Sequence, residues 1–135
     1  MLTKRSLKFI MEKLYLESSN ETPEILFDKN SNKFLIAGKS LPEDVKEFYE
    51  PILGWLKEYK NTPNEETVFE MKMEYFNTAS SKMILEIFEI LRDMHENNFK
   101  VKIHWYYNED DLDMQEDGED YSDMVDIPFE FYAMS

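Results

Sequence analysis

Apolar and polar side chains alternate along several short runs of the chain, with the two-residue period of β-strands that bury one face. The clearest runs are 67–75 and 101–107, and each predicts a strand whose second face is polar. Residues 29–32 join two shorter runs and favour a tight turn, which predicts a β-hairpin. The shorter runs that predict strands are 12–17, 24–28, 33–37 and 127–131.

Apolar residues at spacings of three and four predict a helix between Ser40 and Thr62. Ser40 and Glu43 have the spacing of a capping box, in which two side chains satisfy free backbone donors, so the helix should begin there. Pro51 lacks an N–H donor and crowds the preceding turn, which predicts a kink or a brief break near Glu50.

Two further helices are expected later in the chain. One follows the strand 67–75, with Asn77 or Thr78 as the N-cap, because its apolar residues again recur every three or four positions. The segment 109–126 is strongly acidic, yet its apolar residues lie at helical spacing around Gly118. It therefore predicts a short helix with an acidic outer face.

Three strands followed by helix, strand, helix, strand, helix and strand predict a mixed sheet of about six strands in a two-layer α/β fold. Because several strands alternate in polarity, the helices should cover mainly one face of the sheet. A chain of 135 residues with 42% hydrophobic content is long enough for one core, so residues 11–135 are taken as one domain. Residues 1–10 are interpreted as an N-terminal extension, since their apolar stretch is too short for a signal peptide.

The chain is acidic, with 29 Asp and Glu against 15 Lys and Arg and a formal charge of -14. This charge repels phosphate backbones and anionic lipids, which argues against nucleic acid or membrane as partners. No apolar run approaches the ~20 residues that span a bilayer. The absence of Cys rules out disulfides and Cys-ligated metals and fits a cytoplasmic protein.

Catalytic and cofactor motifs are weak. An EF-hand spacing counted from Asp113 places Met124 where a bidentate Glu is required. His95 and His104 lack the neighbours of a catalytic triad, and the three Gly residues cannot form a phosphate-binding loop. We therefore expect neither an enzyme nor a cofactor. The remaining enzymatic alternative is a metal-dependent hydrolase that uses Asp110, Asp111 and Asp113.

Three hydroxyl side chains lie together where the strand 67–75 gives way to the second predicted helix. A phosphate on Thr78 would meet the free N–H groups and the positive end of the helix dipole, with Lys82 one turn further along as a counter-charge. Alternatively, Thr78 simply caps the helix, and the pattern alone favours that interpretation. The residues of this junction that we assign to partner binding are Tyr75, Asn77, Thr78, Ser80, Ser81 and Lys82.

Several linked motifs resemble the SiaC family of small bacterial regulatory phosphoproteins. The main one is Tyr-Phe-Asn-Thr-Ala-Ser-Ser-Lys at 75–82, preceded by Phe-Tyr-Glu-Pro at 48–51 and followed by Val-Lys-Ile-His-Trp-Tyr-Tyr at 101–107. The resemblance extends from Met11 to Phe131. It departs from the family pattern at Ala79, where a hydroxyl residue is expected.

The resemblance implies a fold similar to SpoIIAA-type (STAS-like) anti-sigma-factor antagonists and a partner-switching role. It also implies that Thr78 is phosphorylated by a dedicated kinase and dephosphorylated by a metal-dependent phosphatase. The unphosphorylated protein would then bind and activate a diguanylate cyclase, in cyclic-di-GMP signalling and biofilm or aggregation control. The alternative within the binding class is an adaptor that acts on a transcriptional regulator, as anti-sigma-factor antagonists do.

Overall fold

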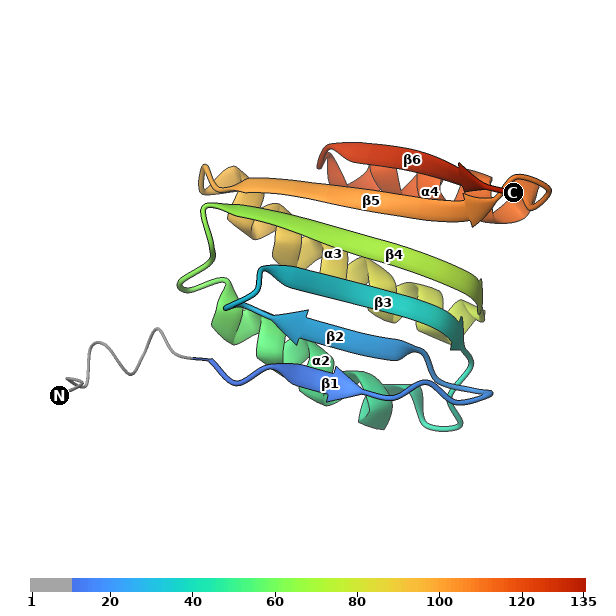
Figure 1. Ribbon diagram of the computed structural model, residues 1–135, viewed down its shortest axis with the longest axis horizontal. Helices are drawn as coiled ribbons and strands as arrows, with labels where there is room; N and C mark the ends of the chain where they lie inside the picture. Colours follow the sequence, from blue (N-terminus) through green and yellow to red (C-terminus); the bar gives the residue numbers. More distant parts are fainter. Residues whose placement is uncertain (1–10) are drawn as a thin grey trace, which may run out of the picture.

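The computed structural model describes residues 11–135, which form six strands and three helices (Figure 1). Residues 1–10, which the sequence analysis separated as an extension, lie outside the described residues. In chain order the elements are β1 (Leu14–Leu16), β2 (Glu24–Asp28), β3 (Lys33–Ser40), α2 (Val45–Tyr59), β4 (Glu66–Phe76), α3 (Thr78–Glu96), β5 (Lys100–Asn108), α4 (Leu112–Val125) and β6 (Phe129–Met134).

All six strands belong to one sheet in which their spatial order equals their order in the chain. The β1–β2 and β2–β3 pairs are antiparallel, whereas β3–β4, β4–β5 and β5–β6 are parallel. Each parallel connection contains one helix, and the three helices lie on the same side of the sheet in Figure 1. The predicted mixed sheet with helices on one face is therefore confirmed.

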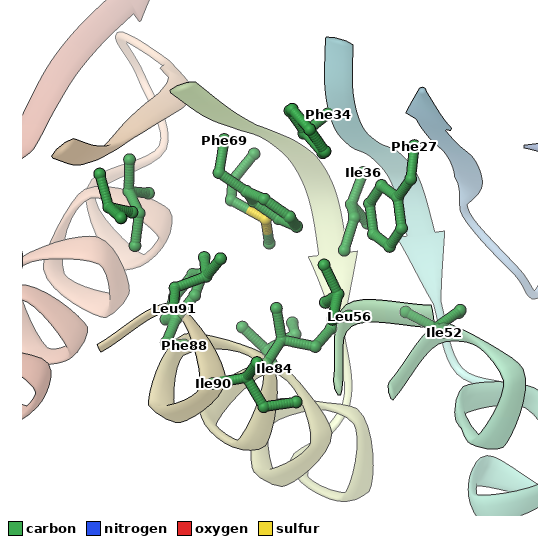
Figure 2. Packing of buried hydrophobic residues seen from close by; sticks show 14 of the residues in the cluster. Phe27, Phe34, Ile36, Ile52, Leu56, Phe69, Ile84, Phe88, Ile90 and Leu91 are labelled. Carbon is green, nitrogen blue, oxygen red and sulfur yellow. The ribbon is translucent and has the colours of Figure 1, made fainter. Parts of the chain in front are cut away.

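The core lies between the sheet and the helices (Figure 2). Phe27, Phe34 and Phe69 project from neighbouring strands, and each is at most 1% exposed. The side chains they meet come from the apolar stripes of the helices, among them Ile52 and Leu56 of α2 and Ile84, Phe88 and Leu91 of α3. The alternation seen in the sequence places polar residues of the same strands on the uncovered face.

The predicted capping box at the start of α2 is wrong. The N-cap is Asp44, whose Oδ1 accepts a hydrogen bond of 3.0 Å from the N–H of Glu47. Ser40 is instead the last residue of β3 and is fully buried. The strand runs three residues beyond its predicted end because it keeps pairing with β4 across a bulge at Gly38, whose φ of +113° suits glycine.

A brief break near Glu50, one of the two effects predicted for Pro51, is absent, since α2 is one continuous helix from Val45 to Tyr59. Pro51 is exposed, whereas the buried residues of α2 lie on the opposite side. Burial of the apolar side of α2 against the core stabilises the helix, although Pro51 contributes no N–H group to it.

Candidate functional site

The start of α3 is fixed by Asn77 at the edge of the sheet where the parallel strands β3 and β4 end. The Asn77 Oδ1 accepts a hydrogen bond of 2.8 Å from the N–H of Ser80, and the Asn77 N–H donates to the carbonyl of Ser40 at 3.0 Å. Asn77 is thus the N-cap. The alternative in which Thr78 merely caps the helix is wrong, because the neighbouring residue performs that task.

Thr78 is the first residue of α3, and its side chain is exposed. Its hydroxyl has no hydrogen-bond partner within residues 11–135, while its carbonyl accepts a 2.7 Å bond from Ser81 Oγ. The N–H groups of Thr78 and Ala79 lie in the first turn, where no earlier carbonyl can accept them. An unused hydroxyl therefore lies next to unused backbone donors.

Ser80 lies beneath this surface and is fully buried. Its Oγ accepts a hydrogen bond of 2.8 Å from Ser40 Oγ, which in turn is 2.7 Å from the hydroxyl of Tyr49. Since Ser40 donates to Ser80, Tyr49 must donate to Ser40. Burial raises the pKa of Tyr49, which keeps its hydroxyl protonated as a donor. The chain of hydroxyls fastens the first turn of α3 to β3 and α2.

We expect Tyr49→Phe to lower the free energy of unfolding by about 1–2 kcal/mol, because it removes the donor that satisfies a buried hydroxyl. The measurement is urea-induced unfolding followed by circular dichroism. Tyr132→Phe is the matched control, since Tyr132 is 38% exposed and its hydroxyl bonds only the surface carboxylate of Glu130 in the described part of the chain. Equal losses in the two variants would contradict the role assigned to the buried hydroxyls.

Of the other residues assigned to partner binding, Tyr75 and Lys82 are exposed and Ser81 is half-buried. Tyr75 is 49% exposed although the alternation of β4 predicts that it points inward like Met73. The cause is the bulge, which pairs Gly38 with Met73 but Lys39 with Tyr75 and so changes the register at the end of the strand. This places an aromatic ring on the surface near Thr78 along the chain.

A groove of about 220 Å³ adjoins the start of α3 and is walled by α3 and α4. Ser81 and Lys82 line it from α3, and Asp117 and Asp120 line it from α4. The hydroxyl of Tyr121 donates a 2.7 Å hydrogen bond to the carbonyl of Ser81 and thereby joins the two walls. Sequence reasoning missed the part that α4 plays here, because only tertiary contacts bring residues 117–124 to the junction at 75–82.

The carboxylates of α4 affect one another. Burial raises the pKa of Asp117, and the nearby charges of Asp120 and Asp113 raise it further. Burial is also the main reason why the pKa of Tyr121 is raised, so this tyrosine remains a hydrogen-bond donor.

The enzymatic alternative finds no support in the arrangement of the acidic residues. Asp111 is the N-cap of α4 and accepts a 3.0 Å hydrogen bond from the N–H of Met114. Within residues 11–135, no three His, Cys, Asp or Glu side chains are placed to hold a metal ion. The Nε2 of His104 lies 3.2 Å from a carboxylate oxygen of Glu130, its partner on the neighbouring strand β6. None of the helices in this part of the chain is long and apolar enough to cross a membrane.

A capped helix start that leaves an exposed threonine unused is suited to modification and recognition by other proteins. The family model described as SiaC family regulatory phosphoprotein matches residues 16–134. The chain therefore belongs to the SiaC family of regulatory phosphoproteins, and the resemblance found in its motifs is confirmed.

Relatives with solved structures share the fold. Apo-SiaC from Pseudomonas aeruginosa superimposes with a TM-score of 0.85 at 23% identity, covering 91% of this chain and 100% of that chain. The structure of the diguanylate cyclase SiaD in complex with its activator SiaC, from the same organism, gives a TM-score of 0.85 at 22% identity, covering 90% and 99%. An uncharacterised protein of Pseudomonas aeruginosa strain UCBPP-PA14 is 23% identical over 123 residues, which are 91% of this chain and 98% of the relative.

Proposed function

We propose that this chain is a non-catalytic signalling protein that is switched by phosphorylation of Thr78 and, when unmodified, binds and activates a diguanylate cyclase. The observation that carries the proposal is the exposed, unbonded Thr78 hydroxyl beside the cap at Asn77. Membership of a regulatory phosphoprotein family supports a phosphorylated role. The description of SiaC as the activator of SiaD supports a cyclase as the partner.

Thr78 is the best phosphate acceptor among the hydroxyls of this junction. Ser80 is buried, and Ser81 already donates its hydroxyl to the carbonyl of Thr78. A phosphate on Thr78 would meet the N–H groups of the first helical turn and the positive end of the helix dipole. Lys82 lies four residues further along α3, so it is on the same side of the helix and supplies a counter-charge.

The surface around Thr78 suits a partner that packs closely against it. Tyr75 offers an exposed aromatic ring, which is a frequent anchor of protein interfaces, and Ala79 is small and exposed. We infer that the cognate kinase, the metal-dependent phosphatase and the cyclase all recognise this surface. We place the switch in the cytoplasm, where the nucleotide substrates of a kinase and of a cyclase are available.

The test is affinity purification from the native cells, with the unmodified protein and Thr78→Ala as baits and Lys100→Ala as the control. Lys100 is exposed and begins β5, so it lies at the opposite edge of the sheet from Thr78. We expect Thr78→Ala to retain a diguanylate cyclase whose cyclic-di-GMP synthesis rises when the protein is added. Recovery of a transcriptional regulator in place of a cyclase would contradict the proposal and favour the adaptor alternative.

A further inference from the structure

The groove between α3 and α4 has an apolar floor and an acidic rim. Phe76 and Leu85 are half-buried in it, Tyr121 is 5% exposed, and Met124 is 52% exposed at its edge. Its volume of about 220 Å³ is smaller than the ~300–1,000 Å³ of sites for drug-sized ligands. Such a space fits one or two side chains of a protein better than a cofactor.

The walls of the groove are held in place before any partner binds. Besides the bond from Tyr121 to Ser81, the indole Nε1 of Trp105 donates a 2.9 Å hydrogen bond to the carbonyl of Met114 in α4. Trp105 is fully buried and contacts Gly118 so closely that no side chain fits between them. A preformed groove loses little conformational freedom when a partner enters it.

The charge of the rim defines the chemistry of the occupant. The α4 sequence contains six carboxylates and no Lys, Arg or His. Asp117 and Asp120 face the groove, and Lys82 is the one cation among its lining residues. A partner that buries an apolar side chain here would bring its flanking residues against these carboxylates, which favours Lys or Arg at those positions.

The groove is continuous with the proposed binding surface, since Ser81 and Lys82 belong to the turn that begins at Thr78. We propose that it receives a basic amphipathic segment of the cyclase, with an apolar side chain on the floor and Lys or Arg side chains against Asp117 and Asp120. This inference rests on the proposed function and adds the chemistry of the partner.

Two pairs of substitutions on α4 test the proposal, each with one member in the groove and one outside it. Asp120→Lys reverses a rim charge, and Asp123→Lys makes the same change at an exposed position that does not line the groove. Met124→Glu places a charge at the apolar edge, and Leu112→Glu is its control, because Leu112 is 65% exposed at the start of the helix.

The readout is affinity for the diguanylate cyclase recovered with the unmodified protein, measured by calorimetry at two salt concentrations. We expect Asp120→Lys to weaken binding at least about tenfold, because it replaces an attractive charge pair at the interface with a repulsive one. Met124→Glu should also weaken binding, because the new carboxylate would be desolvated against the apolar side chain of the partner, and the two controls should change the affinity far less. Unmodified protein should bind more weakly at higher salt, and Asp120→Lys should reduce that dependence. Equal effects within each pair would overturn the proposal.

A second probe separates failure of the groove from failure of the proposed function. A synthetic peptide with Leu and Lys at helical spacing should shift the NMR methyl signals of Leu85 and Met124 more than that of Leu112, and a Leu and Glu peptide should not. If no cyclase binds the protein but the Leu and Lys peptide binds in the groove, the proposed function fails, and the groove remains supported as a site for basic amphipathic segments. If a cyclase binds and neither the peptide nor the groove variants have an effect, the groove proposal fails alone.

Discussion

Phosphorylation of Thr78 is expected to weaken binding of the diguanylate cyclase by about 100-fold or more while leaving the fold intact. A phosphate adds about -1.5 to -2 charge at a position flanked by the uncharged Asn77 and Ala79. The free N–H groups and the helix dipole stabilise that charge within the protein. A partner that packs over it must remove it from water, which costs several kcal/mol, and every ~1.4 kcal/mol is a tenfold loss of affinity.

The measurement is calorimetry with unmodified protein, protein phosphorylated at Thr78 and the Thr78→Ala and Thr78→Glu variants. Thr78→Ala should bind like the unmodified protein but resist the kinase. Thr78→Glu should weaken binding only in part, because one carboxylate carries less charge and fewer acceptor oxygens than a phosphate. Circular dichroism of all four forms controls for the fold. Unchanged affinity on phosphorylation, or a phosphate mapped to Ser81 alone, would refute this mechanism.

Segments whose structure follows from the spacing of their own apolar residues could be predicted well. The acidic helix is the clearest case, since the apolar residues around Gly118 indicated both its existence and its buried side. The structure buries Met114, Gly118, Tyr121 and Val125 of α4. Periodicity succeeds here because one face of the helix must pack on the sheet and the other meets water.

Positions set by pairing between strands could not be predicted from local signals. Ser40 and Glu43 carry a valid capping pattern, but Ser40 pairs with Phe76 and stays in the strand. The same pairing brings the carbonyl of Ser40 to the N–H of Asn77 and fixes where α3 begins. Whether Asn77 or Thr78 caps the helix is a difference of one residue, yet it decides whether the Thr78 hydroxyl is used or free.

The groove between α3 and α4 could not be predicted from the sequence for a different reason. Its residues come from the end of β4, the first turns of α3 and residues 117–124 of α4, which are far apart in the chain. Their proximity follows from the bond between Tyr121 and Ser81 and from the contact of α4 with Trp105. The sequence indicated the charge of α4, but only the fold shows that this charge lies beside the first turns of α3.

The two helical glycines should respond in opposite ways to replacement by alanine. In α4, a Cβ on Gly118 would lie 2.5 Å from Nε1 of Trp105, nearer than a Cβ atom approaches other heavy atoms. Trp105 is fully buried and bonded to Met114, so its ring has no room to move away. We therefore expect Gly118→Ala to lower the free energy of unfolding by about 1–3 kcal/mol, the usual cost of overpacking a core.

Gly54 provides the matched control, because it lies inside α2 and a Cβ there would meet nothing within 4 Å. Gly54→Ala should raise the free energy of unfolding by about 0.5–1 kcal/mol, since alanine loses less conformational freedom in a helix. Urea-induced unfolding of both variants gives the comparison. Displacement of α4 by Gly118→Ala should also weaken cyclase binding, because α4 forms one wall of the groove. If Gly118→Ala were as stable as Gly54→Ala, the tight contact between α4 and Trp105 would be wrong, and with it the argument that the groove is preformed.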